Sequence, residues 1–280
     1  MAIIMDGKAL AKKIREELKE KVKELNGKNI YPKLSVIMVG EDPASKVYVK
    51  NKSKACQDVG IDYEEFLLDE NTTMEELLKL IKELNEREDI HGILLQSPVP
   101  KHLDIQTAFE AIDYRKDVDG FHPINIGKLT IGRDSFISCT PHGVIKILEE
   151  YNIDLKGANT VILGRSNIVG KPLAQCLLNK DATVTICHSK TKNIEEITRN
   201  ADILISAIGK PRFVTSDMVK QGAVVIDVGI NRLETGLVGD VDFEEVEKKA
   251  SYITPVPGGV GPMTIAMLLH NVVKAASTNL

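Results

Sequence analysis

The second half of this chain contains short apolar segments, rich in β-branched residues, that are separated by helical or loop segments. Parallel strands that are covered on both faces have this uniformly apolar composition. Strands with one solvent-exposed face instead alternate between apolar and polar residues. The segments cover Thr160–Leu163, Thr183–Cys187, Ile203–Ile208 and Ala223–Val228. Their alternation with helical segments predicts a doubly wound parallel sheet.

The first half also alternates between the two kinds of element. The pattern predicts helices at 7–25, 44–59, 72–88 and 104–112, and strands at 34–39, 63–68 and 92–96. Gly60 is expected to end the second helix, and Thr72 or Thr73 to cap the third. The glycine- and proline-containing stretch 116–129 is predicted to be a loop, and 141–151 a helix capped by Thr140.

A chain of 280 residues can form two such domains, each with its own core. We expect an N-terminal α/β domain over 1–139 and a second domain over 140–261. The first is expected to recover the last helix, 262–280, because that helix follows a Pro- and Gly-rich turn. An active-site cleft between two domains would suit a reaction with two substrates.

Composition narrows the class of protein. The net charge of −4 gives no broad basic surface for nucleic acid, and no apolar run approaches the roughly 20 residues that span a bilayer. Four scattered cysteines without a C-x-x-C pair argue against a structural metal site or a disulfide framework. The N-terminal segment turns polar after five residues, which is unlike a signal peptide. We therefore expect a cytoplasmic protein without a metal.

The segment VILGRSNIVGKPLAQCLL has the strand–turn–helix order of a Rossmann-like dinucleotide-binding turn, with Gly164 and Gly170 as its glycines. Taken alone this signal is weak, because Ser166 stands where a second glycine is usual. Folds that bind NAD usually carry an acid after the next strand, but here that strand is followed by His188, Ser189 and Lys190. With Arg165 beside the turn, this pattern favours NADP; the alternative is a solvated polar loop.

Tyr48 and Lys52 stand one helical turn apart and share a helix face. The simplest interpretation is an amphipathic helix surface. The same spacing serves short-chain dehydrogenases, but there it follows the glycine turn, and here it precedes the turn by more than 100 residues. That assignment therefore fails on the order of the motifs.

These segments together resemble the bifunctional methylenetetrahydrofolate dehydrogenase/methenyltetrahydrofolate cyclohydrolases. The resemblance covers nearly the whole chain in the family's order. The matching segments are VGEDPASKVYVKNKSKA (39–55), GILLQSPVPKH (92–102), KDVDGFHPINIGKL (116–129), CTPHGV (139–144), GRSNIVGKP (164–172), DVGIN (227–231), GDVDF (239–243) and PVPGGVGPMT (255–264). Ser97 and Ser138 depart from the family pattern, at positions that are not catalytic.

The resemblance implies a role for particular residues. Lys52 matches the cyclohydrolase lysine, Tyr48 the tyrosine that packs on the folate, Gln96 the glutamine beside the lysine, and Asp119 the aspartate that holds the pterin. Pro257, Gly258, Gly259 and Pro262 match the turn that closes over folate and nicotinamide. The cofactor-binding set is Gly164, Arg165, Ser166, Val169, Gly170, His188, Ser189 and Ile230.

The implied chemistry is NADP-dependent oxidation of 5,10-methylenetetrahydrofolate, followed by hydrolysis of the methenyl product to 10-formyltetrahydrofolate. Hydride loss leaves a cation that two nitrogens stabilise, so the first step needs positioning more than a base. The hydrolysis needs proton movement, and we expect Lys52 to act partly as a neutral amine. A homodimer that contributes to purine biosynthesis is also implied. The alternatives are a monofunctional NADP-dependent dehydrogenase and an inactive NADP-binding sensor.

Overall fold

The computed structural model describes residues 1–234 and 236–278, which form two compact units. One unit contains 1–12, 129–133 and 138–264, and we call it the nucleotide unit. The other contains 13–128, 134–137 and the chain from 265 onward, and we call it the lysine unit. The domain limits expected from the sequence stay a prediction, and residues 279–280 of the expected last helix lie outside the described residues.

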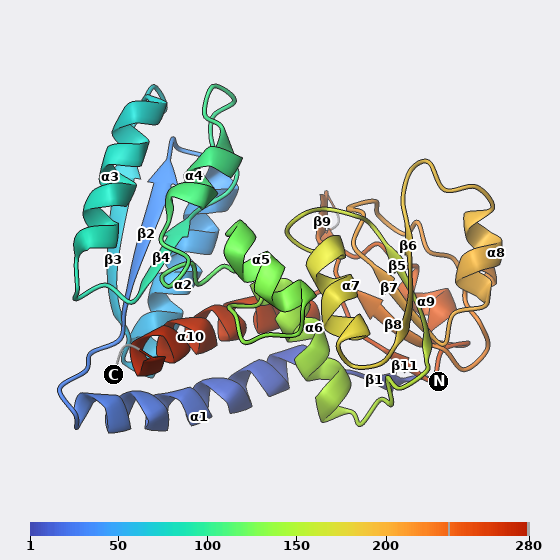
Figure 1. The fold of residues 1–280 in the computed structure, drawn as a ribbon. Helices are drawn as coiled ribbons and strands as arrows, with labels where there is room; N and C mark the ends of the chain where they lie inside the picture. Colours follow the sequence, from blue (N-terminus) through green and yellow to red (C-terminus); the bar gives the residue numbers. More distant parts are fainter. Residues whose placement is uncertain (235, 279–280) are drawn as a thin grey trace. The chain divides into compact units, whose positions relative to one another are not determined.

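The lysine unit is built on a small parallel sheet in the order β3-β2-β4. Its strands are β2 (Lys33–Val39), β3 (Asp62–Leu68) and β4 (Gly92–Leu95). Helices α3 (Met74–Glu86) and α4 (Ile105–Ala111) pack against one face of this sheet (Figure 1). Their contacts form one apolar cluster, which includes Ile37, Val39, Leu77, Ile81, Leu84, Ile93, Leu95 and Phe109.

Local signals fix the helix ends in this unit. Helix α2 (Pro43–Val59) begins where the Asp42 carboxylate accepts a hydrogen bond from the backbone N–H of Ser45. It ends at Gly60, whose backbone adopts the left-handed αL conformation. Helix α3 begins with a capping box between Thr73 and Glu76. The sequence predictions of Gly60 and Thr73 as caps are confirmed.

The nucleotide unit contains a six-stranded sheet whose strands are all parallel, in the order β1-β11-β8-β7-β5-β6. The four predicted strands are β5 (Asn159–Leu163), β6 (Thr183–Cys187), β7 (Ile203–Ser206) and β8 (Val224–Asp227). The chain passes from β5 to β6 on one side and then back to β7 on the other. The predicted doubly wound sheet is confirmed, with its switch point between β5 and β7.

Helices connect these strands. They are α6 (Cys139–Glu150), α7 (Gly170–Leu178), α8 (Ile194–Arg199) and α9 (Phe243–Val246), with a 3-10 turn at Ser216–Met218. Two further helices each contribute residues to both units. Helices α1 (Gly7–Asn26) and α10 (Val260–Thr278) both start in the nucleotide unit and continue in the lysine unit.

Some short elements have no clear periodic signal in the sequence. Strands β1 (Ile3–Ile4) and β11 (Tyr252–Ile253) contain two residues each and extend the large sheet beyond β8. Strands β9 (Asn231–Leu233) and β10 (Gly236–Val238) form a separate antiparallel pair. Segments of two or three residues are too short for a hydrophobic period, so their pairing depends on the rest of the sheet.

The prediction of a loop over 116–129 is wrong in its second half, because Pro123–Thr130 forms helix α5. A buried carboxylate supplies the missing local signal. Asp117 accepts hydrogen bonds from the backbone N–H of His122 and from the side-chain amide of Asn125, which also donates to the carbonyl of Tyr114. These contacts hold the first turn of a helix in a sequence with weak helical periodicity.

The predicted cap of the following helix is also wrong. Helix α6 begins at Cys139, two residues earlier than expected, and Ser138 occupies its N-cap position. The Thr140 hydroxyl instead lies 3.0 Å from the hydroxyl of Thr264. The side chain that the sequence pattern assigned to the cap therefore makes a tertiary contact instead.

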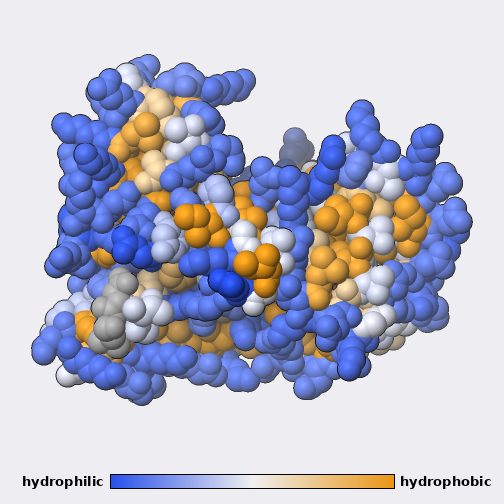
Figure 2. Space-filling model, in the orientation of Figure 1, coloured by the Kyte–Doolittle hydropathy of each residue, from blue (hydrophilic) through white to orange (hydrophobic). Residues whose placement is uncertain are grey.

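The face of the molecule in Figure 2 is mainly hydrophilic, with hydrophobic side chains gathered in separate patches. Among the helices in the described ranges, none combines the length and the apolar character needed to cross a bilayer.

Candidate active site

The lysine unit brings together two of the predicted catalytic residues. Lys52 lies on α2 and is half-buried, and its Nζ donates a hydrogen bond of 2.9 Å to Oε1 of Gln96. Gln96 follows β4 directly, is only 7% exposed, and donates from Nε2 to the carbonyl of Ser97 at 2.6 Å. The glutamine side chain is thus fixed at both ends and orients the lysine amine.

Helix α2 has an accessible residue one turn before Lys52 and a buried residue one turn after it. Tyr48 lies one turn before Lys52 on α2 and is 43% exposed, so its ring can receive a planar ligand. Cys56 lies one turn after Lys52 and is fully buried, and burial raises the pKa of its thiol to about 12. The thiol therefore stays protonated and is no nucleophile near the lysine.

Asp119 lies on a loop that a second aspartate shapes. The backbone at Asp117 bridges in parallel to Ile93 of β4, so Asp119 lies further toward the carboxyl end of that strand, where Gln96 is found. Asp117 is buried and accepts hydrogen bonds from the backbone N–H groups of Gly120 and Phe121. Burial raises the pKa of Asp117. Asp119 is half-buried, which leaves part of this residue accessible.

The glycine turn lies in the nucleotide unit at the switch point of its sheet. Gly164 has a φ of +115°, and a Cβ there would collide with the carbonyl oxygen of Ala207, beyond β7. A Cβ at Gly170 would collide with the carbonyl of Gly164. Both positions therefore require glycine, because the turn and the start of α7 pack backbone against backbone.

The glycine turn leads into the N-terminus of α7, which is suited to binding a phosphate. The Ser166 hydroxyl accepts hydrogen bonds from the backbone N–H groups of Val169, at 3.1 Å, and Gly170, at 3.3 Å. A tight turn followed by a helix N-terminus offers backbone N–H groups and a positive dipole end to a pyrophosphate. Ser138 supports the loop from outside, because its hydroxyl donates to the carbonyl of Ile168 at 2.6 Å.

Arg165 and Ser189 occupy equivalent positions after two neighbouring strands, β5 and β6. Leu163 and Cys187 are paired residues at the ends of adjacent parallel strands, and Arg165 and Ser189 each follow two residues later. Both residues are exposed, and no carboxylate occurs at positions 188–190. His188 starts a turn in which its backbone N–H donates to the Thr191 hydroxyl at 2.9 Å. A guanidinium and a hydroxyl without a nearby acid suit the 2′-phosphate of NADP.

The remaining predicted residues line a cavity of about 180 Å³ in the same unit. It lies beyond the carboxyl end of β8, and its walls include Ile230 and the turn from Pro257 through Gly259 to Pro262. The walls are mainly apolar, which suits the face of a nicotinamide or pterin ring.

Sequence reasoning missed two supporting residues, Asp117 and Ser138. The first could have been found, because an aspartate three residues before a glycine often accepts hydrogen bonds from the backbone of its own turn. Ser138 departs from the family pattern, and nothing in its neighbouring sequence indicates a contact with Ile168, 30 residues away.

The fold and these residues define the class: a two-unit α/β enzyme with a dinucleotide-binding sheet and a separate lysine–glutamine pair. Comparison with known proteins agrees. The model for the tetrahydrofolate dehydrogenase/cyclohydrolase catalytic domain matches residues 5–119, and that for the NAD(P)-binding domain of the same family matches 138–280. The chain therefore belongs to the tetrahydrofolate dehydrogenase/cyclohydrolase family, as the sequence motifs predicted.

Individual relatives support this assignment over the full length. Bifunctional protein FolD of Campylobacter concisus is 59% identical, covering 99% of this chain and 98% of its own. The crystal structure of the bifunctional FolD enzyme of Campylobacter jejuni is 56% identical, with a TM-score of 0.99 over 100% of both chains. The Trypanosoma brucei dehydrogenase-cyclohydrolase, solved with NADP and an inhibitor, is 40% identical, with a TM-score of 0.95 over 99% of this chain and 98% of its own. The bifunctional prediction is thus supported, and the monofunctional alternative is not.

Proposed function

We propose that this enzyme oxidises 5,10-methylenetetrahydrofolate with NADP and then adds water to the methenyl product to give 10-formyltetrahydrofolate. The hydrogen bond between Lys52 and Gln96 is the observation that carries the proposal, because the oxidation alone gives such a pair no proton to move.

The residues of the nucleotide unit fit NADP. The required glycines at 164 and 170 let the backbone approach a pyrophosphate, and Arg165 and Ser189 are placed for the 2′-phosphate. NADP, when bound, supplies a hydride acceptor. Ser166, Val169, His188 and Ile230 complete the proposed binding set; no metal takes part.

The lysine unit holds the folate in this proposal. Asp119 accepts hydrogen bonds from the paired N–H groups of the aminopyrimidine edge, and the accessible Tyr48 ring packs on the folate. The family resemblance assigns the turn of Pro257, Gly258, Gly259 and Pro262, which lines a mainly apolar cavity, to contact with the reacting rings. Hydride loss requires the reacting carbon to stay in line with its acceptor, so these groups act by orientation.

In the hydrolysis Lys52 moves the protons. As a neutral amine it takes one proton from the attacking water while the oxygen bonds to the methenyl carbon. The resulting ammonium returns that proton to N5 as the bond between N5 and the carbon breaks, and the hydroxyl proton leaves to solvent. Gln96 Oε1 holds the Lys52 Nζ in place through both transfers.

Replacing Lys52 with Met tests the assignment. Cyclohydrolase turnover, followed as loss of methenyl absorbance, should fall by about 100-fold or more, as expected for loss of a general acid–base group. NADP reduction with methylenetetrahydrofolate, measured in the same sample, should persist. Undiminished hydrolysis by Lys52→Met would contradict the role of the lysine.

We also propose that the protein is a cytoplasmic homodimer whose product supplies formyl groups for purine biosynthesis. Four free, buried cysteines suit a reducing compartment, and the dimer is supported by the family resemblance alone. Sedimentation at several protein concentrations tests the dimer, and cell fractionation tests the compartment.

A further inference from the structure

Asp240 is a fully buried carboxylate that the proposed reactions leave without a role. Its two oxygens accept hydrogen bonds from the ends of two loops that follow neighbouring strands. Ser206, the last residue of β7, donates from its hydroxyl at 3.1 Å. After β7, the backbone N–H groups of Ile208, Gly209 and Lys210 donate at 2.8, 3.2 and 2.9 Å, and after β8 the Asn231 amide donates at 3.1 Å. One side chain thus fixes both loops.

A second buried aspartate locks Asp240 in place. Asp227, at the end of β8, accepts hydrogen bonds from the backbone N–H groups of Asp240, at 3.0 Å, and Val241, at 2.9 Å. A Cβ at Gly229 would collide with the Asp240 carboxylate, and a Cβ at Gly239 would collide with the Asp227 carboxylate. The segments DVGIN and GDVDF therefore interlock, each glycine leaving room for the aspartate of the other segment.

The place of these loops relative to the cofactor follows from the strand order. The glycine turn after β5 packs against Ala207, so the loop after β7 begins beside that turn. The 2′-phosphate residues follow β5 and β6, on one side of the switch point. A dinucleotide that crosses this edge must extend its other half over the loops after β7 and β8.

Three successive backbone N–H groups in a loop can themselves form an anion-binding hollow. At 208–210 the Asp240 carboxylate occupies that place, so these N–H groups are not available to a phosphate. The carboxylate therefore fixes the backbone that faces the cofactor and also excludes a competing phosphate position.

We propose that Asp240 is a positioning residue that holds the loops after β7 and β8 in the shape that receives the nicotinamide half of NADP. This inference rests on the proposed function, because it takes NADP as the ligand of this edge. Asp240 acts through Ile208–Lys210 and Asn231 and touches no reacting atom.

The test is Asp240→Asn, an isosteric change that turns one acceptor oxygen into a donor. The dissociation constants of NADP and of 2′,5′-ADP, which lacks the nicotinamide half, are measured by calorimetry. Because two or more buried donors lose their acceptor, NADP binding should weaken about tenfold and the dehydrogenase kcat should fall, while 2′,5′-ADP should bind as in the wild type. A purely structural role would weaken both ligands equally.

Asn231→Ala serves as a milder second variant, because it removes only the donor from the β8 loop. It should weaken NADP about threefold and leave 2′,5′-ADP unchanged, since one hydrogen bond is lost. The proposal is overturned if neither variant changes NADP binding, or if both ligands weaken together. If the wild type binds NADP but does not oxidise methylenetetrahydrofolate, the proposed function fails, while the two dissociation constants still decide the role of Asp240.

Discussion

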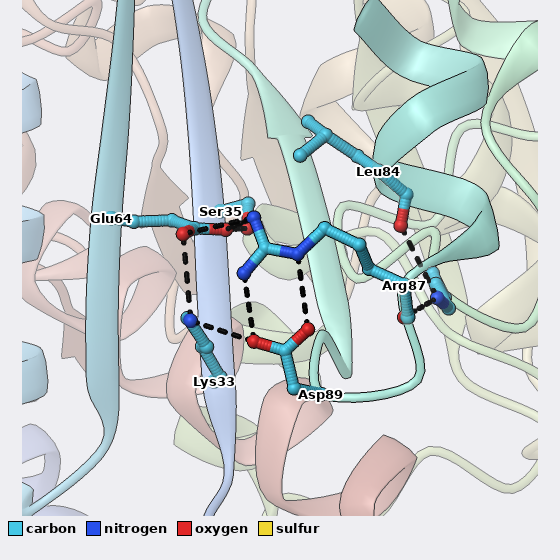
Figure 3. A network of polar contacts seen from close by, with 7 residues as sticks. Lys33, Ser35, Glu64, Leu84, Arg87 and Asp89 are labelled. Atoms are coloured by element: carbon cyan, nitrogen blue, oxygen red, sulfur yellow. Dashed lines mark hydrogen bonds and ion pairs between the residues drawn. The ribbon is translucent and has the colours of Figure 1, made fainter.

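Two groups of charged residues, at opposite kinds of sheet edge, show how differently carboxylates are used in this protein. At the amino end of the three-stranded sheet, Lys33, Ser35, Glu64, Arg87 and Asp89 form a network in which cations pair with anions (Figure 3). At the carboxyl end of the six-stranded sheet, Asp227 and Asp240 accept hydrogen bonds mainly from backbone N–H groups. We call these the amino-end network and the aspartate pair.

The two groups differ in burial and in what they hold. In the network, Arg87 lies 2.7 Å from Asp89 and 3.0 Å from Glu64, but the Asp89 side chain is 54% exposed, so water can replace each partner. Asp227 is 3% exposed and Asp240 is fully buried. A buried donor that loses its acceptor regains nothing from solvent. The comparison indicates that the contribution of a carboxylate to the free energy of unfolding depends on its burial and its backbone donors more than on the number of charges around it.

The largest effect is expected from Asp227→Ala. It leaves the backbone N–H groups of Gly229, Asp240 and Val241 without their acceptor in the core. The free energy of unfolding, from urea titration, should fall by about 3 kcal/mol or more. A loss below about 1 kcal/mol, the size expected for an exposed pair, would remove the distinction between the two groups.

The two groups should also respond to pH in opposite directions. Burial, assisted by the Asp240 charge, raises the pKa of Asp227 to about 6 from an ordinary 3.8. The folded state thus holds this proton more tightly, and the stability that it contributes is present below pH 3.8 and is lost as the pH rises through about 6. Hydrogen bonds from Arg87 and then Lys33 hold the pKa of Asp89 well below 3.8, so its contribution is present above that value and is lost as the pH falls.

Urea titrations across this range measure the difference. Relative to Asp227→Asn, the wild type should lose stability between about pH 4 and about pH 6, because only its carboxyl group titrates there. Relative to Asp89→Asn, the wild type should lose stability only below about pH 4, and by less, because Asp89 is largely solvated. Parallel curves for wild type and Asp227→Asn would show that the raised pKa is wrong.

The smallest effect is expected from Asp89→Ala. Lys33 and Arg87 both keep Glu64 as a partner and remain partly accessible to water. The free energy of unfolding should fall by less than about 1 kcal/mol, and added salt should reduce the difference. A salt-independent loss as large as that of Asp227→Ala would place the network in the same class as the aspartate pair.

Much of the fold could be predicted because its signals are local. The apolar strands of the large sheet, the Gly60 and Thr73 caps and the glycine turn each depend on a few neighbouring residues. Helix α5 and the start of α6 could not be predicted from hydrophobic periodicity. Asp117 holds Asn125 in the first turn of α5, and Thr140 contacts Thr264 instead of capping α6.

The candidate site divides along the same line. The motifs predict Lys52, Gln96, Asp119 and the residues around Gly164 as site residues, and in the structure a hydrogen bond joins Lys52 to Gln96. The Asp117 turn has a local signal in the sequence, whereas the contact of Ser138 with Ile168 is visible only in the folded chain.

The sequence by itself determined the alternation of strands and helices, the dinucleotide-type turn and the family, because short-range periodicity and long motifs carry that information. Only the tertiary structure decided that Asp227 and Asp240 interlock through Gly239 and Gly229. The reason is physical: a buried carboxylate is stabilised by whichever donors the folded backbone brings to it, and those donors come from loops whose meeting point no local pattern specifies.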